Sequence, residues 1–122
     1  LSYIPFMEDE LIVVSSPTLI KSKKVALQDL SKYPMVMREE GAGTRREAEK
    51  YFEVHGLSPE NLVHAGVFGS TDAVKQAVKA GLGIAVVSKY SVEDEVKHGT
   101  LKEIKLSNVR MKRNFCPNFK LC

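Results

Sequence analysis

The sequence predicts an α/β fold with a mixed, mostly parallel sheet flanked by helices. Apolar runs of strand length alternate with amphipathic segments of helical period, and the connections between them are short. Glycine followed by cap-type residues separates strand from helix at two places. With 122 residues, of which 43% are hydrophobic, the chain can fill the core of one ordinary domain.

The expected elements alternate along the chain. Strands are expected where short apolar runs stand between turn signals, and helices where apolar residues recur every third or fourth position. The expected strands cover residues 11–14, 35–37, 63–68, 82–87 and 101–106. The expected helices cover residues 27–30, 44–55, 73–78 and 91–97. Gly56, Gly81 and Gly99 follow three of these helices and are expected to stop them.

The junction between the strand at 35–37 and the next helix combines a glycine turn with a cap pattern. Gly41-Ala42-Gly43 allows a tight reversal, and a missing Cβ lets a ligand approach the backbone. Thr44, followed three residues later by Glu47, has the pattern of a capping box. Free amides at such a helix start, together with the helix dipole, form an anion-binding site.

A second turn repeats this chemistry after the strand at 63–68. Ser70-Thr71-Asp72 supplies cap residues for the following helix, and Ser91 with Asp94 suggests a further capping box. We expect the turns at Thr44 and at Ser70 to project from the carboxyl ends of neighbouring strands, with an anion between them. Helix capping alone explains the same residues equally well.

Several sharper chemistries do not fit the sequence. The third glycine position of a dinucleotide fingerprint is Arg46, and the turn lacks the Lys-Ser or Lys-Thr pair of a P-loop. The histidines are scattered over different elements without ligand spacing: His55, His64 and His98. No histidine is placed to make a triad with Ser70-Thr71-Asp72. We therefore predict no catalytic residues, no metal and no cofactor, and the protein is not expected to be an enzyme.

The charge distribution and the cysteines limit the kinds of partner and compartment that the sequence supports. The net charge is +3, and residues 108–122 carry four basic residues without an acid, so the remaining body is near neutral. This argues against a nucleic-acid-binding face on the folded part. The acid clusters at 8–10 and 93–95 are expected to be solvated. Cys116 and Cys122 lack zinc or redox spacing and are expected to be unpaired thiols in a reducing compartment.

No membrane association is expected. No apolar run approaches the roughly 20 residues that span a bilayer, and the N-terminus lacks the order of a signal peptide. Because the chain starts without Met, we expect a fragment or a processed product.

Five stretches, in this order and spacing, carry a family resemblance. They are Glu8-Asp9-Glu10-Leu11-Ile12-Val13-Val14, Leu27-Gln28-Asp29-Leu30, Arg38-Glu39-Glu40-Gly41-Ala42-Gly43-Thr44-Arg45, Ala80-Gly81-Leu82-Gly83-Ile84-Ala85 and Gly99-Thr100-Leu101. Each is weak alone, but the ordered set over residues 6–106 resembles the effector-binding (substrate-binding-like) domain of LysR-type transcriptional regulators.

The resemblance implies a periplasmic-binding-protein-like (type II) fold, in which two α/β subdomains enclose an effector cleft. It further implies a cytoplasmic bacterial regulator that binds a small effector, which the two capped turns indicate to be an anion. DNA would be bound only through an N-terminal winged helix-turn-helix absent from this chain, and the intact protein would be a homodimer or tetramer. A solute-binding protein of a transport system, which shares the fold, is the alternative.

Two departures from the family pattern suggest a partial domain. The first half of the first subdomain is missing, and residues 116–122 do not resemble the usual ending, although Arg113-Asn114-Phe115 fits the return strand. We therefore take residues 17–107 as the second α/β subdomain within a partial effector-binding domain over 1–122. Residues 1–16 and 108–122 are expected to be stubs of the first subdomain.

The expected effector-binding residues are taken from the two capped turns. They are Glu39, Gly43, Thr44, Arg45, Ser70 and Thr71. The hydroxyls and the amides of residues 43–45 suit an anion. A carboxylate at Glu39 does not, so it is expected to pair with Arg38 or Arg45, or to favour an effector bearing an amine.

Overall fold

The computed structural model describes residues 7–107 and 109–115. The predictions for Cys116, Cys122 and the rest of the ending fall outside these residues. Within the described part, no helix is both long and apolar enough to cross a membrane.

Strands and helices alternate along the chain, as the sequence predicts. The strands are β1 (Met7–Ser15), β2 (Lys24–Val25), β3 (Pro34–Arg38), β4 (Val63–Phe68), β5 (Ala85–Ser88), β6 (Lys102–Leu106) and β7 (Met111–Phe115). The α-helices are α1 (Gly43–Val54), α2 (Thr71–Lys79) and α3 (Glu93–His98), and the 3-10 turns are η1 (Leu27–Lys32), η2 (Pro59–Asn61) and η3 (Lys89–Val92).

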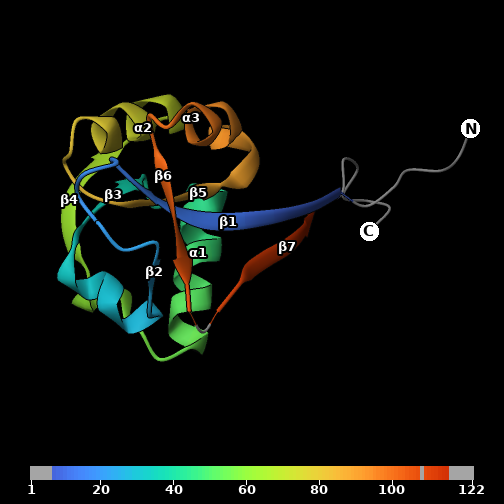
Figure 1. Cartoon of the computed structure of the whole chain (residues 1–122). Helices are drawn as coiled ribbons and strands as arrows, with labels where there is room; N and C mark the ends of the chain where they lie inside the picture. Colours follow the sequence, from blue (N-terminus) through green and yellow to red (C-terminus); the bar gives the residue numbers. More distant parts are fainter. Residues whose placement is uncertain (1–6, 108, 116–122) are drawn as a thin grey trace, which may run out of the picture.

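The sheet is mixed, and β1 is its long central strand (Figure 1). It pairs antiparallel with β5 on one side, and with β6 and β7 on the other. Parallel pairing joins β2 to β6 and β3 to β4, and a bridge between Met35 and Ile84 links the two sheets. The mixed sheet is therefore confirmed. Parallel pairs do not predominate in it, because β5, β6 and β7 all pair antiparallel with β1.

Helices cover both faces of the sheet, which explains the continuous apolar run in β1. Leu11 and Val13 belong to one buried cluster, which includes Phe52 of α1. Ile12 and Val14 belong to the cluster on the other face, with residues of α2. Residues 11–14 therefore lie in the middle of the same sheet as β5 and β6, although they precede the boundary expected at residue 17.

The end of α1 matches its prediction, but its start does not. Leu57 N–H donates to the carbonyl of Phe52 at 2.8 Å and Gly56 has a φ of 86°, which completes a Schellman motif. At the start, Ala42 is the N-cap and makes no side-chain cap bond. The chain turns early, because Ala42 N–H donates to the carbonyl of Glu39 at 3.0 Å. Thr44 therefore lies inside the first turn, and the predicted Thr44–Glu47 capping box is wrong.

Three further predictions in the second half need correction. The strand expected at 82–87 begins only at Ala85, and Leu82 is exposed after the left-handed turn at Gly81. Ser91 does not cap α3: its hydroxyl donates to the carbonyl of Ser88 at 2.7 Å, and Val92 is the N-cap. Within the 93–95 acid cluster, the Glu95 side chain is only 16% exposed, because it is paired with Lys75.

Candidate functional site

A cavity lies where β3 and β5 end and where α1 and α2 begin. Its empty volume is about 280 Å³, including space on the solvent side. It is lined by Arg38, Thr44, Thr71, Val74, Val86, Val87, Ser88 and Ser91. The strand pairs β3–β4 and β3–Ile84 are parallel, so the carboxyl ends of these strands share one edge of the sheet. Ligands bind at this edge in open α/β sheets.

Arg38 is the cation of this cavity. As the last residue of β3, it directs its guanidinium toward the start of α2. Its Nη1 donates to Thr71 Oγ1 at 3.2 Å, and its Nε donates to Glu39 Oε1 at 2.8 Å. A guanidinium has five N–H donors in a planar fork that suits carboxylate and phosphate groups. Arg38 therefore brings positive charge and further donor capacity to the cavity.

Glu39 pairs with Arg38, which is one of the two partners expected for it. Its side chain is half exposed, and the hydrogen bond from Arg38 holds the pKa of the carboxyl below its ordinary value. Glu39 is not among the residues that line the cavity. Its carboxylate therefore offsets part of the Arg38 charge from outside the cavity.

The two turns expected to face each other do so through their threonines. They follow β3 and β4, which are neighbouring parallel strands, as predicted. Thr44 of α1 and Thr71 of α2 both line the cavity. Ser70 is the N-cap of α2: its hydroxyl accepts from Ala73 N–H at 3.1 Å. Gly43 and Ser70 do not line this cavity.

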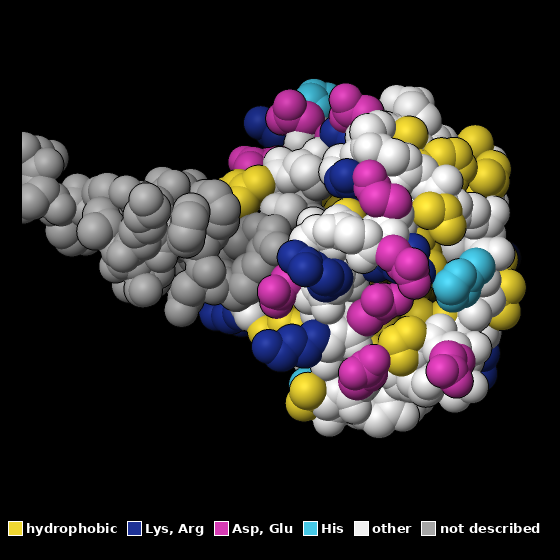
Figure 2. All heavy atoms as spheres, turned by 180° about the vertical axis from the view of Figure 1, so that it is seen from behind, with side chains coloured by type: hydrophobic (Ala, Val, Ile, Leu, Met, Phe, Trp, Pro, Cys, Tyr) yellow, Lys and Arg dark blue, Asp and Glu magenta, His cyan; other side chains and the backbone are white. Residues whose placement is uncertain are grey.

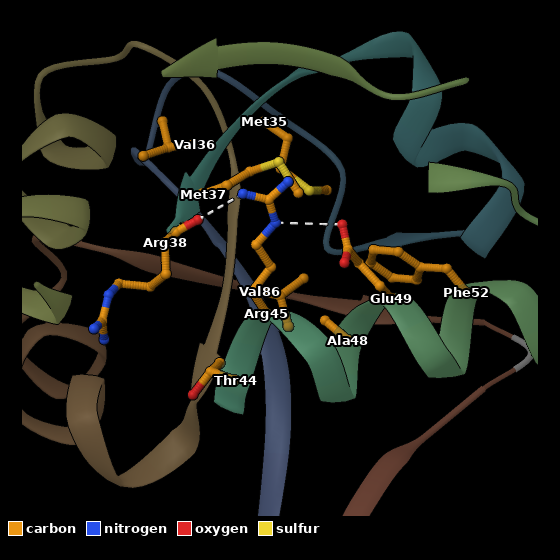
Figure 3. Close-up of a pocket in the computed structure, with 10 residues that line it drawn as sticks. All are labelled: Met35, Val36, Met37, Arg38, Thr44, Arg45, Ala48, Glu49, Phe52 and Val86. Carbon is orange, nitrogen blue, oxygen red and sulfur yellow. Dashed lines mark hydrogen bonds and ion pairs between the residues drawn. The ribbon is translucent and has the colours of Figure 1, made fainter. Parts of the chain in front are cut away.

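Arg45 lies apart from the other expected residues. Its side chain is 11% exposed and lies against α1, on a second, largely apolar cavity whose volume of about 310 Å³ includes space on the solvent side. Its Nη1 donates to the carbonyl of Arg38 at 3.0 Å, and its Nε donates to Glu49 Oε2 at 3.3 Å. Figure 3 shows the side chains of Arg45 and Arg38 pointing in opposite directions. Only the backbone of Arg45 remains at the helix start.

Sequence reasoning did not select Arg38, Ser88 and Ser91 as site residues. Arg38 and Ser88 are the last residues of β3 and β5. Their position at the carboxyl ends of strands, where ligands bind in α/β sheets, could have identified them. Ser91 lies in η3, where its helical neighbours suggested a cap. Among the described residues, no group of three or more His, Cys, Asp or Glu side chains could hold a metal ion.

The sequence model of the family described as "LysR substrate binding domain" matches residues 1–116. The chain therefore belongs to the LysR substrate-binding domain family. It is 36% identical over 110 residues to the HTH-type transcriptional regulator YeiE of Escherichia coli (strain K12), covering 89% of this chain and 36% of that protein. It is 35% identical over 112 residues to the activator CmpR of Synechocystis sp. (strain ATCC 27184 / PCC 6803 / Kazusa), covering 90% of this chain and 36% of that protein. The chain thus spans about a third of the length of these relatives.

Two solved structures share the fold. The regulatory domain of CcmR from Synechocystis PCC6803, in complex with 2-PG, aligns with a TM-score of 0.75 at 24% identity, over 93% of this chain and 57% of that one. The effector-binding domain of QuiR, in complex with shikimate, aligns with a TM-score of 0.71 at 20% identity, over 94% and 56%. These likenesses establish the periplasmic-binding-protein-like fold.

Proposed function

We propose that this chain is the ligand-sensing part of a bacterial LysR-type transcriptional regulator, and that its cavity binds a small anionic effector that controls transcription. The observation that carries the proposal is the Arg38 guanidinium beside the hydroxyls of Thr44 and Thr71. These groups line one cavity with the start of α1, where Thr44 lies and where the N-cap makes no side-chain bond. A guanidinium, hydroxyls and a helix start together stabilise an oxyanion.

The expected residues take different roles in this proposal. Thr44 and Thr71 contact the effector through their hydroxyls, while Gly43 and Arg45 contribute backbone amides at the start of α1. Glu39 tunes the charge of Arg38. Ser70 keeps the start of α2 in place, since its hydroxyl is engaged in the cap.

The comparisons support a small ligand and a regulatory role. The two similar structures contain 2-PG and shikimate, which are both small molecules. The relatives YeiE and CmpR are named as transcriptional regulators, which favours a regulator over a solute-binding protein of a transport system and over an enzyme.

The whole protein then extends beyond this chain. We place the second α/β subdomain at residues 17–107, with residues 1–16 and 108–122 leading to the first. In the intact protein, which would act in the cytoplasm as a homodimer or tetramer, an N-terminal helix-turn-helix would bind DNA. The stub at residues 1–16 includes β1, which pairs with β5, β6 and β7, so this boundary divides the sequence and does not divide the sheet.

The isolated chain should not bind DNA sequence-specifically. Figure 2 shows acidic and basic side chains intermixed on one face of the body, without a basic stripe. Phosphate contacts alone would give only salt-sensitive, non-specific binding. A salt-resistant electrophoretic shift of one specific duplex by this chain would contradict this part of the proposal.

The test of the proposal is an NMR titration of the chain with inorganic phosphate and, separately, with succinate. Saturable shifts should appear at the amides of Gly43, Thr44, Thr71 and Ser88. A variant in which exposed Arg46 is replaced by Met should behave like the parent, because Arg46 does not line the cavity. If neither anion gives saturable shifts at these amides, the cavity is not an anion site.

A further inference from the structure

Lys75 lies behind the cavity, where it connects α2 to η3. It follows Val74, which lines the cavity, and stands one helical turn after Thr71 on α2. Its side chain is only 14% exposed. Its ammonium donates to the carbonyl of Ser91 at 2.9 Å, across the gap between α2 and η3.

Glu95 of α3 is the nearer of two carboxylates beside this ammonium; the other, Asp72 Oδ1, lies 3.7 Å away on an exposed side chain. The distance between Lys75 Nζ and Glu95 Oε2 is 2.6 Å, and the Glu95 side chain is 16% exposed. Figure 1 shows α2 and α3 next to each other on the same side of the molecule. A short charge-assisted bond between two largely enclosed groups fixes geometry better than a solvated surface pair.

The contacts continue from this pair to the end of β5. Ser91, whose carbonyl accepts from Lys75, donates its hydroxyl to the carbonyl of Ser88 at 2.7 Å. Ser88 and Ser91 both line the cavity. A connected set of contacts therefore runs from Glu95 through Lys75 and the Ser91 carbonyl, and from the Ser91 hydroxyl to the carbonyl of Ser88.

We propose that Lys75 and Glu95 are positioning residues of the effector site, which hold the segment from Ser88 to Ser91 at a fixed distance from Thr71. The proposal rests on the proposed function in so far as the cavity binds an anion. The pair touches no ligand. It acts through the carbonyl of Ser91, and so sets how far the serine side of the cavity stands from α2.

The chain offers matched controls for both partners. Lys79 lies one turn after Lys75 on α2 and makes a longer and more exposed ion pair with Glu95, at 3.9 Å with its side chain 30% exposed, so it controls for the loss of a nearby positive charge. Glu93 starts α3 and is exposed. The test variants are Lys75→Met and Glu95→Gln, the latter nearly isosteric, and the controls are Lys79→Met and Glu93→Gln.

The first measurement is amide hydrogen exchange by NMR without any ligand. Both test variants should speed exchange at residues 88–92 by about threefold to tenfold, the range expected when one hydrogen bond is lost. Exchange in α1 and β1 should change less, and the controls should match the parent. A uniform increase over the whole chain would assign the pair to general stability alone and overturn the proposal.

The second measurement is the phosphate dissociation constant, well below the unfolding temperature. We expect it to rise about threefold to tenfold in the test variants and to stay within about twofold in the controls. Phosphate binding that is unchanged in both test variants would overturn the positioning role while leaving the proposed function intact. If the parent binds no anion, but exchange at 88–92 responds, the proposed function fails and the role of the pair in holding this segment stands.

Discussion

The two sides of the cavity are built in different ways. The first wall consists of Arg38 and Thr44, from the end of β3 and the start of α1. The second wall consists of Thr71, Ser88 and Ser91. The second wall is tied internally, by the Ser70 cap and by the contact from Lys75 to Ser91. The first wall presents a cation and a helix start whose N-cap makes no side-chain bond.

This difference indicates which wall has hydrogen-bond donors left for a ligand. At a helix start with a side-chain cap, one of the first backbone amides already donates to the cap. At an uncapped start, these amides are left to donate to water or to a ligand. The first wall is held from behind instead: the largely enclosed side chain of Arg45 donates to the carbonyl of Arg38. We therefore expect the first wall to dominate affinity and the second to shape the cavity.

The largest effect is expected for Arg38→Met. It removes the charged donor of the first wall, and hydrogen bonds to charged groups contribute about 1.5–3 kcal/mol. The phosphate dissociation constant from the NMR titration should therefore rise at least about tenfold. Arg38→Lys keeps the charge but loses the fork, and should fall between the parent and Arg38→Met. Equal binding by the parent and Arg38→Met would remove Arg38 from the site.

The hydroxyls of Thr44 and Thr71 should follow. Replacing each by Ala removes one neutral hydrogen bond to the ligand, worth about 0.5–1.5 kcal/mol, and more if the ligand is charged. The double variant should bind phosphate more weakly than either single variant, at unchanged circular dichroism. Binding equal to that of the parent would show that these threonines have no part in recognition.

The outline of the first wall could be predicted from sequence, but its chemistry could not. The strand-to-helix order and the Schellman ending at Gly56 depend on local signals, and the structure confirms them. The direction of Arg45 depends on tertiary packing: the space beside Phe52 and the carbonyl of Arg38 receive its guanidinium. The capping box at Thr44 failed because the turn closed at Ala42, within the same set of local residues.

In the second wall, too, the sequence predicted a local feature and missed a contact between helices. Ser70 was predicted as a cap from its local pattern, and it is one. Glu95 was predicted to be solvated, because nothing in its own segment announces Lys75, which lies 20 positions earlier on another helix. Local rules thus identified the Gly56 ending and the Ser70 cap, but they misplaced the starts of α1 and α3 and did not reveal contacts between helices.

A stability comparison separates a cap from a ligand contact. Ser70→Ala removes the bond to the Ala73 amide and should lower the free energy of unfolding by about 1 kcal/mol. Thr44→Ala removes no cap, so its change should stay within about 0.5 kcal/mol. Urea denaturation of both variants at equal slope gives the comparison. If Thr44→Ala proves as destabilising as Ser70→Ala, the first wall also depends on a side-chain cap and the contrast between the walls disappears.

The smallest effect concerns pH and the second wall. The hydrogen bond from Lys75 holds the pKa of Glu95 below the ordinary glutamate value of 4.5. A carboxyl with a lowered folded-state pKa contributes stability that is present above the unfolded-state pKa and is lost as the pH falls through the folded-state pKa. The free energy of unfolding of the parent should therefore fall on acidification below about 4.5. Glu95→Gln should flatten this dependence by about 0.2–1 kcal/mol, the size of one such ion pair. Glu93→Gln, which removes an exposed carboxylate from the same helix, serves as the control in urea titrations at a series of pH values. If the parent and Glu95→Gln lose stability with the same slope, the pair is not held tightly enough to brace the second wall.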